Sequence, residues 1–165
     1  MFEDFVGNEA VTLQIDPKVE DALKLLGLEE RVIQAIFQKS LRAVGGWVVR
    51  EMANALTASG QGQPGGSAWE ALKPKTAESK RIREASPLIG VDSGHMLRSL
   101  TPDTKGYDID KAKLMMMAGS TMPYSLYFSK GTKRGMPARP LNPTSTHLLN
   151  WWAPAHAEII DRRGK

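Results

Sequence analysis

Apolar residues follow a helical spacing most clearly between residues 29 and 56. They recur there every three or four positions, at Ile33, Phe37, Leu41, Val44, Val48, Met52 and Ala55. This spacing predicts one long amphipathic helix, roughly 40 Å long at ~1.5 Å per residue. Gly45 and Gly46 lie inside it, and each costs about 1 kcal/mol relative to alanine in a helix. Either the helix bends at these glycines, or another backbone packs closely against them.

A shorter strand and helix are expected before this long helix. Residues 10–15 (AVTLQI) alternate between apolar and polar side chains, which predicts a strand. Asp16 and Pro17 favour the start of a helix directly after it, because aspartate caps free amides and proline suits the first helical position. Gly27 favours the end of that helix.

The second half of the chain is rich in strand signals. We expect antiparallel strands over residues 96–101 and 113–118, and a further short strand over residues 124–128. From about residue 144 to 163 the pattern becomes helical again. Pro154 is expected to end or kink that last helix.

Two segments rich in glycine and proline separate these elements. Residues 57–68 (TASGQGQPGGSA) predict a flexible loop, which is either an ordinary disordered loop or an arm that orders against a neighbouring subunit. Residues 130–143 (KGTKRGMPARPLNP) predict a second loop with structured turns. Between them, Pro74 breaks the chain before a short basic helix that Thr76 is expected to cap.

Together these patterns predict an α+β fold. It consists of an antiparallel β-sheet of about four strands, packed against a long N-terminal helix and a C-terminal helix. The length of 165 residues is typical of one domain. Residues 1–165 are therefore expected to form a single domain with long flexible loops.

Composition and charge narrow the function only a little. The net charge of +4 and the isoelectric point near 9.4 leave open a small basic nucleic-acid-binding protein, which would use residues 80–83 and 130–134. Such basic runs are more often solvated helix faces. The absence of cysteine excludes disulfides, thiolate metal sites and cysteine nucleophiles. Residues 1–5 are acidic where a secretory signal is basic, and no window approaches ~18 continuous apolar residues, so we expect a cytosolic protein without a membrane partner.

Signals for catalysis or for a cofactor are weak. His95, His147 and His156 are too far apart for a compact metal motif. Asp92 and Ser93 lie beside His95, but neighbours in one turn cannot align as nucleophile, base and orienting group. No phosphate-binding loop, nucleophile elbow or dinucleotide motif is present. We therefore expect a protein that is not an enzyme and that has no cofactor and no metal.

Several short blocks follow one another between residues 69 and 145. They are Trp69-x-x-Leu72-x-x-x-Thr76-x-x-x-Lys80, Pro87-Leu88, Ser93-Gly94-x-x-Leu97-x-Ser99-Leu100, Ala118-Gly119-Ser120, Tyr124-x-x-Tyr127-x-x-x-Gly131-Thr132 and Met136-Pro137-Ala138-Arg139-Pro140-Leu141. In this order they resemble the virion-morphogenesis (tail-completion) family of Mu-like phages and prophages. The family commonly has threonine where this chain has Ser93, and phenylalanine where it has Leu141. The first 68 residues resemble the family only in the order of their expected elements, a strand followed by helices.

The resemblance implies a structural protein of the virion that completes the tail or joins head to tail. It would assemble as a ring at the neck, with a hexamer favoured, and would occupy the host cytoplasm during assembly. Its partners would be copies of itself, the tail tube, the head connector or both, with non-specific contact to DNA in the channel. The candidate assembly residues are Trp69, Leu72, Thr76, Lys80, Gly94, Leu97, Ser99, Tyr124, Tyr127, Gly131, Thr132, Pro137, Arg139 and Pro140.

Each of these residues can also have a plain role in the fold. Trp69 can pin the end of the preceding loop through its large apolar ring and its N–H. Pro137 and Pro140 can stiffen the approach to the last helix, with Arg139 held between them for an ion pair. We expect replacement of Trp69 or Arg139 to leave a folded monomer that assembles less well.

Overall fold

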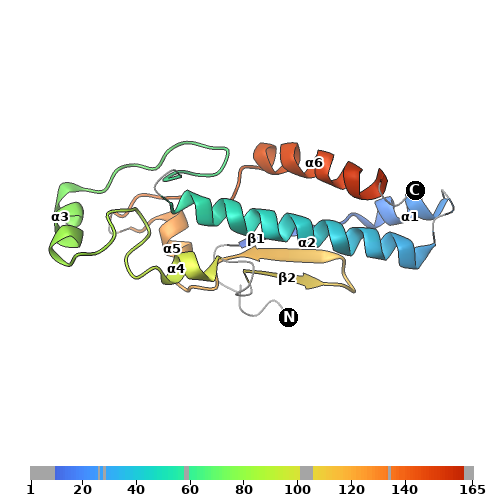
Figure 1. Cartoon of the computed structure of the whole chain (residues 1–165), viewed down its shortest axis with the longest axis horizontal. Coiled ribbons are helices and arrows are strands. Elements are labelled where there is room, and N and C mark those ends of the chain that lie inside the picture. Colours follow the sequence, from blue (N-terminus) through green and yellow to red (C-terminus); the bar gives the residue numbers. More distant parts are fainter. Residues whose placement is uncertain are drawn as a thin grey trace.

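The computed structural model describes residues 10–25, 27, 29–57, 60–100, 106–133 and 135–161. In chain order the elements are β1 (Ala10–Gln14), α1 (Pro17–Leu25), α2 (Glu30–Ala55), α3 (Pro74–Ile82), α4 (His95–Ser99), β2 (Tyr107–Asp110), β3 (Met115–Gly119), α5 (Ser125–Lys130) and α6 (Ser145–Asp161). The long helix α2 lies between a small sheet and α6, and α3 lies at one end of the molecule (Figure 1). The α+β class, the long helix and the C-terminal helix are confirmed.

The sheet has three antiparallel strands in the order β1-β3-β2. On one side of the central strand Val11 lies opposite Ala118, and on the other side Ile109 lies opposite Met116. Met116 and Ala118 are fully buried and belong to the same apolar cluster as α2. The expected count of about four strands is therefore wrong for the described part of the chain.

Two segments that were expected to be strands are helices. Residues 95–99 form α4, because Gly94 at its N-terminus has a φ of 75° and Met96 and Leu100 then reach the core from positions four apart. Residues 125–130 form α5, in which Ser125 and Phe128 are buried at helical spacing. A run of five or six residues fits the period of a strand and of a helix equally well, so its packing decides.

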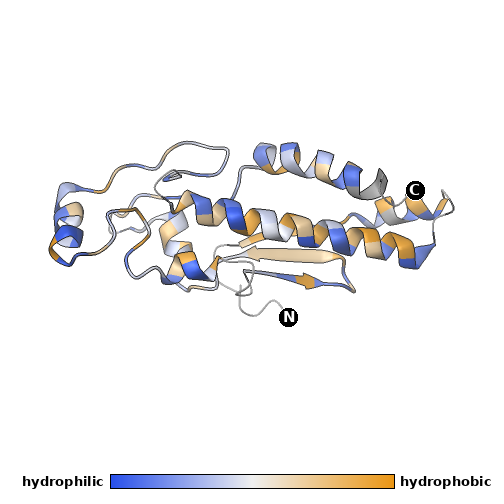
Figure 2. Ribbon diagram, viewed as in Figure 1, coloured by the Kyte–Doolittle hydropathy of each residue, from blue (hydrophilic) through white to orange (hydrophobic). Residues whose placement is uncertain are grey.

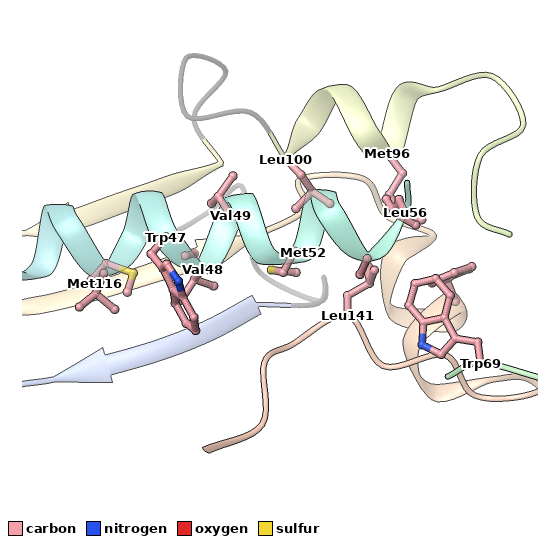
Figure 3. Close-up of a cluster of buried hydrophobic side chains, with 14 of the residues drawn as sticks. Trp47, Val48, Val49, Met52, Leu56, Trp69, Met96, Leu100, Met116 and Leu141 are labelled. Atoms are coloured by element: carbon pink, nitrogen blue, oxygen red, sulfur yellow. The ribbon is translucent and has the colours of Figure 1, made fainter. Parts of the chain in front are cut away.

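The core forms around α2, whose apolar stripe is buried as expected. Val48, Val49 and Met52 are all 0% exposed, and Figure 3 shows them among side chains from α4, β3 and the segment before α6. Burying each such side chain stabilises the fold by about 1.5–3 kcal/mol. The opposite, hydrophilic positions of α2 appear blue in Figure 2.

The two glycines inside α2 have different surroundings. A Cβ atom added at Gly45 would lie 2.7 Å from Cδ2 of Tyr107 on β2, whereas a Cβ at Gly46 would meet nothing within 4 Å. The close neighbour of Gly45 is thus an aromatic side chain and not a backbone segment. Gly45 lets β2 approach α2, and Gly46 has no such packing role.

The C-terminal helix α6 packs on α2 through aromatic and polar contacts. The rings of Trp47 and Trp151 stack with centroids 4.8 Å apart, and Ser40 Oγ lies 2.7 Å from His156 Nδ1. Of the two alternatives for Pro154, an end of the helix is wrong, since α6 continues to Asp161, and a kink stays a prediction. The carbonyl that Pro154 leaves without an amide partner belongs to Asn150, which is exposed and accessible to water.

The segment expected to be a flexible loop is tied to the start of α6. Gly62 forms an isolated bridge with Ala68, and the amide of Thr144 donates to the carbonyl of Pro64 at 3.0 Å. A Cβ at Gly65 would collide with His147. The flexibility of residues 57–68, and their contact with a neighbouring subunit, remain predictions.

A candidate assembly groove between α3 and α5

A groove of about 510 Å³ lies at the end of the molecule that carries α3. Its walls come from the start of α3, the turn around Gly90, the helix α5 and the loop that follows α5. Its lining is mostly apolar. The candidate assembly residues that line it are Leu72, Thr76, Lys80, Tyr124, Pro137 and Arg139. The fold thus brings together residues from distant blocks of the sequence.

Lys80 holds one wall of this groove in place. Its side chain is 7% exposed, and Nζ donates to the carbonyls of Ser86, Leu88 and Val91, each at 2.8 Å. A charged ammonium has three N–H groups, so these bonds use all of them. Burial lowers the pKa of Lys80, and the nearby carboxylate of Asp92 opposes this effect. Lys80 therefore fixes the segment after α3 and is not a free surface cation.

Arg139 brings a buried positive charge to the groove. The residue is 6% exposed, and its Nη2 donates to the carbonyl of Glu70 at 3.3 Å. Its backbone amide is held by the carbonyls of Phe128 and Ser129, both at 3.1 Å. Its buried Nε has no acceptor among the described residues. Burial lowers the pKa of Arg139, with Glu70 acting in the opposite direction.

Exposed apolar side chains lie on the two helices that border the groove. Tyr127 on α5 is 61% exposed, Tyr124 at the N-cap of α5 is 44% exposed, and Ile82 on α3 is 70% exposed. Tyrosine is enriched at protein interfaces, because its ring combines a large apolar area with a polar group.

Trp69 lies below the groove, in the core. It is 9% exposed, its ring meets Phe128 edge-on at 5.4 Å, and its Nε1 donates to the carbonyl of Pro140 at 3.2 Å. It pins the chain ahead of α3 to the segment before α6. Because Trp69 and Arg139 are both buried, replacing either should also cost stability; that the variants leave a folded monomer that assembles less well stays a prediction.

The helix α3 starts differently from the expectation. It begins at Pro74, whose fixed φ and missing N–H suit the first helical position, and Lys73 occupies the N-cap. Thr76 is therefore not the capping residue. Its side chain is exposed and lines the groove.

The basic run Lys80–Arg83 is largely neutralised within the subunit. Arg81 donates to both carboxylate oxygens of Glu78, at 3.0 and 2.6 Å. Arg83 donates to both carboxylate oxygens of Asp92, at 3.1 and 3.3 Å. Exposed pairs of this kind add little to stability, but they reduce the positive field that a phosphate backbone would meet.

Three of the candidate residues lie around α4, outside the groove lining. Gly94 adopts a left-handed conformation at the N-cap, and Leu97 packs half-buried against the core. Ser99 Oγ lies 2.8 Å from Ser120 Oγ and donates to the carbonyl of Met96 at 2.7 Å. These residues hold α4 on the end of the sheet.

Gly131 and Thr132 shape the loop after α5. Gly131 has a φ of 75°, and a Cβ there would lie 2.7 Å from the carbonyl oxygen of Met136. The amide of Thr132 donates to that same carbonyl at 3.0 Å. In the basic segment 130–134, Lys130 and Lys133 are exposed, and residue 134 lies outside the described residues.

The structure places the residues that the sequence analysis considered for catalysis or metal binding. Among the described residues no three histidine, aspartate or glutamate side chains gather into a metal site. His156 is hydrogen-bonded to Ser40, but Ser40 is 1% exposed, so no substrate reaches its hydroxyl. Asp92, which lies near His95 in the sequence, pairs with Arg83 instead.

Comparison with protein-family models, with curated protein sequences and with solved structures finds no match to this chain. The resemblance to tail-completion proteins therefore depends on the ordered sequence blocks alone. In the described part of the chain no helix is both long and apolar enough to cross a membrane.

Sequence reasoning missed several residues that complete the groove. Ile89, Met96 and Phe128 form part of its apolar lining, and Lys73 and Met136 lie at its edge. The sequence carried one signal for them, since Met96 and Phe128 lie within or beside the quoted blocks. Their side chains point into the groove only because α4 and α5 are helices.

Proposed function

We propose that this protein is a structural subunit of a phage virion that completes the tail or joins head to tail. It assembles as a ring at the neck, and a hexamer is favoured. Its partners are copies of itself together with the tail tube, the head connector or both. It occupies the host cytoplasm until it joins the virion.

One observation carries this proposal beyond the sequence. Residues from three of the quoted blocks, including Leu72, Tyr124 and Arg139, line a single groove. The groove contains a buried Nε without an acceptor among the described residues, and exposed tyrosines lie beside it. A buried guanidinium that is incompletely hydrogen-bonded is unfavourable in an isolated subunit, and an anionic group that enters the groove from a neighbouring subunit would offset its charge.

The architecture suits a ring of identical subunits. The helix α2 packed on the sheet makes a stiff body, and the helix α3, whose start lines the groove, lies at one end of it (Figure 1). In a cyclic ring each groove meets a different surface of the next subunit, so the contact is heterologous. The loops 57–68 and 130–143 extend the surface available to neighbours.

Negative-stain microscopy of the purified protein tests the proposal, alone and mixed with tails that were assembled without it. We expect rings, or a cap at one end of the tails. Tyr127→Asp should abolish both, because it places a charge beside the groove on a residue that is 61% exposed. Leu149→Asp is the matched control, since Leu149 is 55% exposed but lies on α6.

A different outcome would favour the nucleic-acid-binding alternative. A monomer that ignores tails and retards DNA on a gel, with an affinity that falls steeply as salt rises, would refute the assembly proposal. Equal loss of rings in both aspartate variants would show that the groove end is not the assembly surface.

A further inference from the structure

The buried charge of Arg139 limits what the groove can bind. A guanidinium that lines the groove and is 6% exposed is best matched by a carboxylate. Lys73 adds a second, exposed cation at the edge, where its Nζ donates to the carbonyl of Gly135 at 3.2 Å. The acidic group of the lining, Asp92, is already paired with Arg83. The groove is therefore suited to an anionic group.

The rest of the lining specifies the neighbours of that anion. Leu72, Ile89, Phe128 and Met136 provide an apolar surface around the arginine. A volume of about 510 Å³ accommodates a few side chains of a peptide rather than a whole element of structure. The expected ligand is thus a short segment in which carboxylates lie next to large apolar residues.

The chain contains such a segment at its own N-terminus. Residues 1–9 read MFEDFVGNE, so that Glu3 and Asp4 are flanked by Phe2 and Phe5, and this segment lies outside the described residues. The other end of the chain, residues 162–165, reads RRGK and has the same sign of charge as the groove. Charge complementarity therefore selects the N-terminal segment.

The fold also places the start of this segment at the correct end of the sheet. Ala10, the first described residue, lies opposite Gly119 at the end of β3. From there the chain passes through Ser120, which is bonded to α4, and enters α5. Nine residues span at most ~30 Å when extended, which is sufficient to reach a subunit packed against this end.

We infer that the N-terminal segment of one copy binds in the groove of a second copy, where a carboxylate of Glu3 or Asp4 accepts from Arg139. This inference deepens the proposed function and rests on it, because the same contact repeated around a ring links all subunits. Each copy supplies one segment and one groove.

Binding is measured with a fluorescent peptide of residues 1–9 and the full-length chain that carries Glu3→Gln and Asp4→Asn, so that its own segment does not compete. We expect the anisotropy to rise on binding. The same peptide with both acids replaced by amides should bind at least about tenfold more weakly, since a hydrogen bond between charged groups is lost. Changes in the peptide leave the protein fold untouched.

A variant of the groove gives the complementary test. Thr76→Glu places a carboxylate in the groove at an exposed position of α3, and Thr76→Gln is the neutral control of the same shape. Thr76→Glu should abolish peptide binding, whereas Thr76→Gln should retain it. Circular dichroism shows that both remain folded.

Mixing two full-length variants distinguishes exchange between copies from binding within one chain. The chain with Glu3→Gln and Asp4→Asn keeps only the groove, and the chain with Thr76→Glu keeps only the segment, so neither should self-associate. An equal mixture of the two should form a one-to-one dimer in sedimentation. Each of three results would overturn the inference. The wild-type chain stays monomeric, the variants associate like the wild type, or the mixture of the two variants stays monomeric. Capping of tails by the variants is scored separately, so that caps without peptide binding would refute the inference and leave the proposed function standing.

Discussion

Adjacent glycines in the middle of α2 offer a sharp test of how the sheet packs on this helix. Gly46→Ala adds a methyl group where nothing lies within 4 Å, so only helix propensity changes. We expect it to raise the free energy of unfolding by about 1 kcal/mol. Gly45→Ala gives the same gain in propensity but places its Cβ against the ring of Tyr107.

The geometry sets the size of the opposing effect. The new Cβ at residue 45 would lie 2.7 Å from Cδ2, 2.8 Å from Cγ and 3.2 Å from Cβ of Tyr107, whereas favourable carbon contacts begin near ~3.5 Å. A rotation about χ1 of Tyr107 would move Cδ2 and Cγ, but the ring is packed against the core, and the contact with Cβ is relieved only if β2 moves. Such overpacking costs about 1–3 kcal/mol. The net loss for Gly45→Ala is then up to about 2 kcal/mol, and the two variants differ by about 1–3 kcal/mol.

Urea unfolding followed by tryptophan fluorescence and by circular dichroism measures both variants. For a chain of this length each kcal/mol shifts the melting temperature by roughly 2–4 °C, so thermal melts should order the proteins as Gly46→Ala, wild type and Gly45→Ala. Adding Tyr107→Ala to Gly45→Ala should remove most of the penalty, and a double-mutant cycle isolates this coupling. If Gly45→Ala stabilised the protein as much as Gly46→Ala, β2 would not pack on α2 as described.

Three further predictions test other contacts. Trp69→Ala should destabilise the fold by about 3–5 kcal/mol in urea unfolding, with Trp69→Phe costing less; a fully stable Trp69→Ala chain would contradict its burial. Lys80→Met should cost about 2–4 kcal/mol, because it leaves three carbonyls without their donor, whereas Arg81→Met, at an exposed pair, should cost under about 1 kcal/mol. Burial lowers the pKa of His156, so the folded state binds fewer protons than the unfolded state. The free energy of unfolding should therefore fall as the pH drops below about 6.5, by less than about 1.4 kcal/mol per pH unit. His156→Gln should lose this part of the pH dependence, and an unchanged slope would refute the prediction.

The elements that could be predicted from the sequence are those in which the pattern of apolar and polar residues repeats many times. The stripe of α2 repeats over 26 residues, so one exception such as Gly45 does not obscure it. β1 alternates clearly, and α6 keeps its apolar spacing through Pro154 because the proline removes only one backbone bond on an exposed side. β3 was predicted two residues early, since Leu114 takes a φ of 45° in the turn that precedes it.

The short elements could not be predicted because their conformation depends on distant contacts. Met96 and Leu100 look like strand residues until α2 provides a surface on which positions four apart can both be buried. The same holds for α5, where Phe128 packs edge-on against Trp69 from far away in the sequence. Local propensity is weak in runs this short, and tertiary packing decides between helix and strand.

The groove could not be predicted for a further reason, because the sequence blocks do not show whether their residues are buried or exposed. In the sequence, Lys80 looks like part of a solvated basic run. Its three partners in the structure are backbone carbonyls. Because every residue has a backbone carbonyl, the residue types in a sequence cannot indicate such partners. Trp69 and Arg139 read as contacts for a partner, yet both are buried in the subunit. The blocks therefore describe mainly how the groove is built. Thr76, an exposed residue of the groove lining, and Tyr127, which is exposed on α5, are the positions at which substitutions would test the proposed assembly with the least effect on the fold.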